Sequence, residues 1–306
     1  MEQISKKKEV WPVMLTPFTD SGEVDYHALD ALIDWYEAAG VDGLFAVCQS
    51  SEMFYLSLRE RVELAAHIKR RAKVPVIASG HVSSGREDQL EELRRVADTG
   101  VDALVLLTNR MATEDADSAA WIGGLAWLLD RLPSEIPLGL YECPHPYKKL
   151  LTEEELTFCL NSGRFRFLKD TCCDIDRIRE RTRLLAGSSF GLYNANTATC
   201  LDSLRSGAAG FSGVMANFHP ALYVWLCRNW ETAPEKAERL QAALTVCSFS
   251  ESRPYPVTAK YYLGEKGLPI GCNTRSRRST ELTDLVKSEI MQMGALAEFV
   301  AEALEL

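Results

Sequence analysis

The amino-acid sequence predicts an α/β protein, a (β/α)8 or TIM barrel with a helical extension at its C-terminus. Short apolar runs alternate with longer segments whose apolar residues recur at three- and four-residue spacing, which favours strands alternating with amphipathic helices. Eight such strand–helix units occur, the number that closes a parallel barrel. No G-x-G-x-x-G motif follows the first strand, so an open dinucleotide-binding sheet is disfavoured.

The predicted strands are runs of five to seven residues, most of them apolar. They span residues 11–17, 43–47, 75–79, 103–107, 137–142, 166–170, 190–194 and 209–213. Around the sixth run, arginine alternates with phenylalanine before Leu168 and Lys169. This alternation is typical of a strand, and Lys169 is expected where the strand ends. Parallel neighbours need long crossover connections, and the segments between these runs are long enough to form helices.

Helical patterns follow the strands. Residues 26–40 carry apolar side chains at helical spacing, and Gly40 marks the end of that helix. The helices after the next four strands are expected at residues 56–72, 87–100, 117–132 and 152–163. Beyond residue 231 the pattern predicts helices only, with a connecting segment at 262–279. We therefore predict a barrel catalytic domain over residues 1–231 and a C-terminal helical subdomain over residues 232–306.

Composition limits the class of protein. The chain has 306 residues, of which 46% are hydrophobic and 25% charged, as expected for a globular protein with a large core. Its formal charge of -9 disfavours nucleic acid and anionic membranes as partners. The lysine-rich start lacks the apolar region of a signal peptide, and no apolar run is long enough to span a bilayer.

The cysteine pattern indicates a reducing compartment. The nine cysteines are an odd number and show no C-x-x-C spacing, and only Cys172 and Cys173 are adjacent. A disulfide framework or a zinc site is therefore not expected. We predict a cytoplasmic protein.

Catalytic groups of barrel enzymes lie where the strands end. The segment 48–52, "CQSSE", follows the second strand, Tyr141 ends the fifth and Lys169 ends the sixth. Burial lowers the pKa of a lysine, and the neutral amine can attack a ketone to give a protonated Schiff base and then an enamine. Tyr141 could move the protons, and Ser50 and Ser51 could hold a carboxylate.

The residues alone leave an ordinary structural interpretation open. A lysine at a strand end is often an ion-pair partner, and a tyrosine there is often a half-buried core residue. Serine and glutamate in "QSSE" are also common at the start of a helix. The spacing does not decide between these roles and catalysis.

The chain resembles the dihydrodipicolinate synthase / N-acetylneuraminate lyase family of pyruvate-dependent class I aldolases. The resemblance is carried by "LTPF" at 15–18, Tyr141 followed by Pro144, "LKD" at 168–170 and the stretch 207–217. It implies a barrel with a C-terminal helical extension, no metal or other cofactor, and a homo-oligomer, either a dimer or a tetramer. It also implies that Lys169 is the Schiff-base lysine and that Tyr141 transfers protons.

The chain departs from the family pattern at three places. The loop that usually has the pattern G-[ST]-T-G-E is "CQSSE" here, and lost glycines can forbid a positive φ, so we predict a changed loop shape. Pro146 replaces an arginine of the synthases, and Met111 replaces a tyrosine that reaches a neighbouring subunit in many members. The resemblance therefore does not imply the lysine-biosynthesis synthase itself.

Candidate substrate-binding residues are Gln49, Ser50 and Ser51, together with Ser212, which would face the substrate according to the family pattern. The possible residues of the acceptor site, which would bind the second substrate, are His81, Arg110 and His145. An ordinary surface role is the alternative for each of these three residues.

We expect a carbon–carbon or carbon–oxygen lyase of the class I aldolase type that acts on pyruvate or another 2-oxo acid. One alternative is a 2-keto-3-deoxy sugar acid dehydratase that uses the same imine. Another is a non-catalytic binding or regulatory paralogue, because fold does not establish activity. The sequence leaves the acceptor, the direction and stereochemistry of the reaction and the oligomeric state open.

Overall fold

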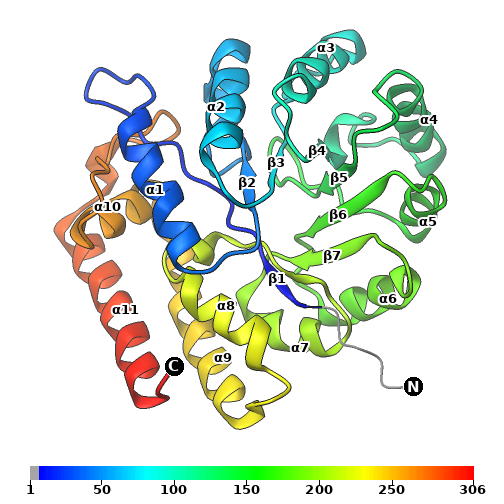
Figure 1. Ribbon diagram of the computed structural model, residues 1–306. Helices are drawn as coiled ribbons and strands as arrows, with labels where there is room; N and C mark the ends of the chain where they lie inside the picture. The colour runs from blue at the N-terminus through cyan, green and yellow to red at the C-terminus, as the bar shows by residue number, and fades with distance from the viewer. Residues whose placement is uncertain (1–6) are drawn as a thin grey trace.

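The computed structural model describes residues 7–306 and shows a ring of strands surrounded by helices (Figure 1). Part of the lysine-rich start, where no signal peptide is expected, lies outside these residues. The strands are β1 Glu9–Val10, β2 Leu44–Ala46, β3 Val76–Ala78, β4 Ala103–Leu107, β5 Leu138–Tyr141, β6 Phe165–Asp170, β7 Gly191–Asn194 and β8 Gly210–Phe211. All neighbours pair in parallel, in the order β1-β8-β7-β6-β5-β4-β3-β2. The predicted barrel is confirmed.

The first strand is the place where the structure differs most from the predicted strand boundaries. Regular pairing of β1 with β8 ends at Val10, whereas the prediction ran over 11–17. Pro12 has no N–H and cannot continue a ladder on both sides. Its carbonyl instead accepts a hydrogen bond from Phe45 N at 3.0 Å, and an isolated parallel bridge joins Val13 to Phe45. This irregular backbone links β1 to β2 and closes the ring.

The barrel helices cover the outside of the sheet. Their bounds are α1 Tyr26–Ala38, α2 Leu58–Arg71, α3 Arg86–Ala97, α4 Ser118–Leu129, α5 Glu153–Asn161, α6 Ile175–Leu185, α7 Cys200–Arg205 and α8 Pro220–Asn229. Helix α2 begins with a capping box, in which Ser57 and Glu60 satisfy each other's backbone N–H groups, and α5 begins with the same device. These caps fix the residues at which α2 and α5 begin, after the loops that follow β2 and β5.

Aromatic rings fill the barrel interior. Phe167 stacks on Tyr193 with ring centroids 4.4 Å apart, and its edge contacts Trp11 at 5.8 Å. Phe45 contacts Tyr141 at 5.7 Å. Such pairs contribute roughly 1 kcal/mol each beyond the area that they bury. The packed interior makes the strand ends, rather than the barrel axis, the place where a ligand can enter.

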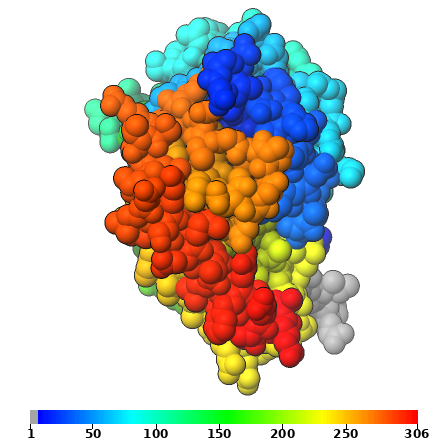
Figure 2. All heavy atoms as spheres, turned by 90° about the vertical axis from the view of Figure 1, so that its left-hand side faces the viewer, coloured from blue at the N-terminus to red at the C-terminus, as the bar shows by residue number. Residues whose placement is uncertain are grey.

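Three further helices follow the barrel: α9 Pro234–Ser248, α10 Val257–Glu265 and α11 Asp284–Ala303. They pack beside α8 and α1, and Figure 2 shows α10 and α11 along this side of the molecule. No helix within residues 7–306 is long and apolar enough to cross a membrane. The domain boundary at residue 231 stays a prediction.

Candidate active site

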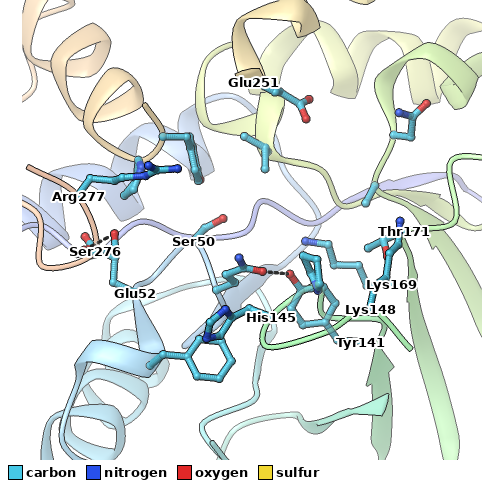
Figure 3. Close-up of a pocket in the computed structure, with 18 of the residues that line it drawn as sticks. Ser50, Glu52, Tyr141, His145, Lys148, Lys169, Thr171, Glu251, Ser276 and Arg277 are labelled. Carbon is cyan, nitrogen blue, oxygen red and sulfur yellow. Dashed lines mark hydrogen bonds between the residues drawn. The ribbon is translucent and has the colours of Figure 1, made fainter. Parts of the chain in front are cut away.

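A cavity of about 570 Å³ opens at the carboxyl end of the strands (Figure 3). Strand-end residues form its floor, and loops and the C-terminal extension form its walls. Lys169, Tyr141, Gln49 and Ser50 line it together. Barrels place their active sites at this end, because the loops there vary while the strands hold them rigidly.

Lys169 is the last residue but one of β6, and it pairs in register with Tyr141 at the end of β5. The lysine is only 4% exposed, and its Nζ lies 4.5 Å from the centroid of the Tyr141 ring. Burial lowers the pKa of Lys169 to about 8, and the thiols of Cys48 and Cys143 oppose this effect. About a tenth of the amine is therefore neutral at pH 7.

Tyr141 keeps its proton at neutral pH. Burial raises the pKa of its hydroxyl well above the ordinary value. The hydroxyl donates to Gln49 Oε1 at 3.4 Å, and the thiol of Cys143 contacts the same oxygen at 3.5 Å (Figure 3). Because the bond to Gln49 is long, a better acceptor in the cavity could take its place.

A buried ionic cluster fixes the ends of β5 and β6. Arg181 of α6 binds Glu142 Oε1 through Nη2 at 2.7 Å and Asp170 through Nη1. Glu142 directly follows Tyr141, and Asp170 directly follows Lys169. Burial raises the pKa of Glu142, and the guanidinium of Arg181 opposes that rise. Arg181 thus holds in place the two strand ends that carry the amine and the phenol.

The loop after β2 folds back on the first strand. Ser51 Oγ donates to Met14 O at 2.7 Å and accepts from Cys48 N at 3.1 Å, so this buried side chain does not line the cavity. Positive φ angles occur at Val47 (45°) and Glu52 (60°). They flank Cys48 and Ser51, which stand where glycines were expected. A branched valine in this region is strained by about 1–3 kcal/mol.

Ser50 faces the cavity. Within residues 7–306, the N–H groups of Ser51 and Glu52 donate to Cys48 O and Gln49 O, whereas the N–H of Ser50 has no hydrogen-bond acceptor. Figure 3 shows the Ser50 hydroxyl and the Lys169 amine extending into the same space. A free N–H beside a hydroxyl is suited to bind an anion.

The remaining predicted residues lie in different surroundings. Ser212 is buried, and its Oγ donates to Trp11 O at 2.8 Å. His81 is buried as well: its Nε2 accepts from Leu107 N at 2.7 Å, and burial lowers its pKa to about 3. Neither residue lines the cavity.

Of the three possible acceptor-site residues, the structure brings only His145 to this cavity. Its exposed ring packs edge-on against Phe54, with centroids 4.6 Å apart. Arg110 lines a separate cavity of about 520 Å³ beside Tyr147. The roles of all these residues stay predictions.

The sequence pattern does not predict several of the residues that line the cavity. Glu251, Tyr255 and Ser276 belong to the C-terminal extension and reach the cavity only because this extension docks on the barrel. Enclosure by the cavity wall raises the pKa of Glu251 to about 7, and the charge of Lys169 opposes the rise. The residue as a whole is exposed, so solvent also limits this rise.

A buried ion pair attaches the extension to the loop after β2. Glu52 Oε1 lies 2.8 Å from Lys260 Nζ, and both side chains are fully buried. Glu52 Oε2 accepts from the backbone N–H groups of Arg275 and Ser276, and Lys260 also donates to Asn273 O at 2.7 Å. The wall formed by the extension is therefore tied directly to the segment that carries Ser50.

Lys260→Met should destabilise the fold by roughly 3 kcal/mol, because it leaves the buried carboxylate of Glu52 without its counter-ion. Urea denaturation monitored by fluorescence measures this change. Lys266→Met, which breaks an exposed pair with Glu298, is the matched control and should cost under about 1 kcal/mol. Equal losses in the two variants would contradict a special role for the buried pair.

No cluster of three or more His, Cys, Asp or Glu side chains arranged to hold a metal ion occurs within the described residues 7–306.

Comparisons with known proteins agree with the fold. The model of the dihydrodipicolinate synthetase family matches residues 6–292. The 4-hydroxy-tetrahydrodipicolinate synthase of Laribacter hongkongensis is 28% identical over 287 residues, covering 90% of this chain and 94% of that protein. The enzyme of the same name from Haloarcula marismortui is 29% identical over 212 residues, covering 69% of this chain and 68% of that protein.

Solved structures share the whole fold. A catalytic lysine mutant of the Ruminococcus gnavus sialic acid aldolase matches with a TM-score of 0.86 at 18% identity, covering 99% of this chain and 100% of that one. YagE, a prophage protein of the dihydrodipicolinic acid synthase family from E. coli K12 in complex with pyruvate, matches with a TM-score of 0.81 at 22% identity, covering 98% and 99% of the two chains. By its sequence, this chain belongs to the dihydrodipicolinate synthetase family, whose members are lyases of the aldolase type.

Proposed function

We propose that the protein is a Schiff-base-forming class I aldolase or lyase that acts on pyruvate or another 2-oxo acid. The observation that carries this proposal is the buried Lys169 amine, 4.5 Å from the ring of Tyr141, on the floor of a cavity that Ser50 also lines. A lysine whose pKa lies near 8 supplies neutral amine at working pH. The complex of YagE with pyruvate supports a donor of this size.

The reaction would begin with attack of Lys169 Nζ on the keto carbon. A carbon–nitrogen bond forms, and the keto oxygen takes one proton from Tyr141 and one from the attacking nitrogen. The carbon–oxygen bond then breaks, and loss of that oxygen as water leaves a protonated imine beside the Tyr141 phenolate. The positive nitrogen then withdraws electrons, so that the neighbouring carbon loses a proton and becomes an enamine. Tyr141 regains its proton in these steps and can pass it on when the enamine reacts.

The carboxylate of the 2-oxo acid would bind the N–H and hydroxyl of Ser50. These donors face the cavity, and a hydrogen bond to an ionised group is about twice as strong as a neutral one. Gln49, whose amide oxygen already accepts from Tyr141, would orient the phenol.

We also propose that the substrate differs from that of the lysine-biosynthesis synthase. Pro146 is exposed and directly follows the cavity residue His145, and Met111 is buried at a position where many family members have a tyrosine. Neither side chain can donate a hydrogen bond to a polar second substrate. An assay for 4-hydroxy-tetrahydrodipicolinate formation should therefore show no product.

Borohydride trapping with pyruvate, followed by peptide mass spectrometry, tests the imine directly. A reduced adduct is expected on the Lys169 peptide and should be absent from Lys169→Ala. Lys148 lines the same cavity, so Lys148→Ala is the matched control and should retain the adduct. An adduct only with longer 2-oxo acids would indicate a sugar-acid dehydratase. The absence of any adduct in folded protein would overturn the mechanism and favour a non-catalytic paralogue.

A further inference from the structure

We infer that Tyr255 is a further binding residue of this site, and that its hydroxyl holds the substrate carboxylate together with Ser50. Tyr255 belongs to the C-terminal extension, between the short helix Phe249–Ser252 and α10. It is half-buried and lines the cavity. The inference rests on the proposed 2-oxo acid substrate, which requires a carboxylate site.

The hydroxyl of Tyr255 is held from behind by Asn217. Asn217 Nδ2 donates to Tyr255 Oη at 2.7 Å and to Val13 O at 2.9 Å, so both amide hydrogens are used. Asn217 Oδ1 accepts from the hydroxyl of Tyr36. A flipped amide would place its oxygen against the carbonyl of Val13, so this orientation is fixed. The oxygen of Tyr255 is therefore an acceptor toward Asn217, and its own hydrogen is free to donate elsewhere.

Ser50 lies close enough to this hydroxyl to affect its pKa, and both side chains line the cavity. The structure shows no direct hydrogen bond between these two hydroxyl groups, so each keeps its own hydrogen. Both hydrogens can point into the cavity beside the free N–H of Ser50. Burial raises the pKa of Tyr255 well above the ordinary value, so the phenol stays a neutral donor.

The need for a second hydroxyl follows from Gln49. This residue precedes Ser50 and contributes an amide in place of a hydroxyl, and its oxygen accepts from Tyr141. A carboxylate has two oxygens and is bound best by several convergent donors. Ser50 supplies two of these donors through its N–H and hydroxyl, and Tyr255 supplies a third from the C-terminal extension.

Tyr255→Phe removes this donor and preserves the ring. In borohydride trapping, we expect the half-saturating pyruvate concentration to rise about 10- to 100-fold, as for loss of a hydrogen bond to a charged group, with the trapping rate at saturation nearly unchanged. With pyruvamide, a ketone that lacks the carboxylate, the same substitution should have no effect. Tyr223→Phe removes a buried tyrosine hydroxyl that bonds to Thr197, outside the cavity, and should change neither value.

A second measurement separates this inference from the proposed function. In Lys169→Ala no imine can form, so thermal-shift titration reports non-covalent pyruvate binding alone. Weaker binding in Lys169→Ala/Tyr255→Phe would support the role of Tyr255 even if the native protein forms no adduct. Unchanged binding there, or an equal effect on pyruvate and pyruvamide, would overturn the inference. A lower saturated rate with unchanged half-saturation would overturn it too, because it would place Tyr255 in proton transfer.

Discussion

Lys169→Met should abolish turnover and, at neutral pH, make the protein more stable. Loss of the nucleophile removes the covalent route altogether, so kcat for any 2-oxo acid substrate is expected to fall by about 10⁵-fold or more. Methionine fills a similar volume without a charge. Activity and stability therefore change in opposite directions at one residue, as expected where an active site holds a group in unfavourable surroundings.

The gain in stability follows from the lowered pKa of the lysine. Burial reduces this pKa from 10.5 to about 8, so protonated Lys169 is disfavoured in the folded state. A shift of that size corresponds to about 3 kcal/mol. For a lysine with a depressed folded-state pKa, the cost is fully present below pH 8 and disappears above pH 10.5.

Urea denaturation of both proteins between pH 7 and pH 10.5 measures this effect. Lys169→Met should exceed the native protein by about 3 kcal/mol at pH 7, and the difference should shrink as pH rises. Lys148→Met, at an exposed cavity lysine, is the control and should show no such trend. A constant difference across this range would show that Lys169 titrates normally.

Much of the barrel could be predicted because each strand has its own local pattern. The run over 103–107 is continuously apolar and bounded by polar residues, and β4 has the predicted bounds. Tyr141 and Lys169 could be found for the same reason, since neighbouring parallel strands bring their ends together. The strand predicted around Pro12 shows the limit of such patterns. The apolar neighbours of Pro12 favour a strand, but its missing N–H interrupts the hydrogen bonding that a strand needs.

The direction of side chains could not be predicted from strand ends alone. Ser51, Ser212 and His81 all stand near such ends, yet each bonds to backbone inside the protein. Whether a side chain at a strand end turns into the cavity or into the wall depends on loop conformation. In the loop after β2, that conformation includes positive φ angles at Val47 and Glu52, which no residue type there would suggest.

The residues that the C-terminal extension contributes to the site could not be predicted from local sequence patterns. Tyr255 and Glu251 are separated from Lys169 by more than 80 positions, and only the packed fold brings them to one cavity. The buried pair of Lys260 with Glu52 is one of the contacts that fix this docking. Apolar periodicity can indicate that a helix packs, but it does not indicate against which loop.

Arg181→Met should destabilise the fold by about 5 kcal/mol at pH 7 and also reduce kcat. The substitution leaves two neighbouring carboxylates, Glu142 and Asp170, buried without a cation, which is the costly case for a buried ion cluster. The ends of β5 and β6 lose their common anchor, and displacement of Tyr141 and Lys169 by about 1 Å can cost roughly 100-fold in rate.

The pH dependence identifies the cause. Without Arg181, the folded-state pKa of a buried carboxyl lies above its unfolded value, so the stability of the variant is highest below the unfolded pKa and falls as pH rises through the folded pKa. Denaturation at pH 5 and pH 7 should therefore show the larger loss at pH 7. Arg205→Met breaks an exposed pair with Glu238 and should show little loss at either pH.

The triple variant Glu142→Gln/Asp170→Asn/Arg181→Met removes every charge of the cluster and should recover most of the lost stability. A triple variant as unstable as Arg181→Met would mean that the packing of the arginine, and not its charge, fixes the two strand ends.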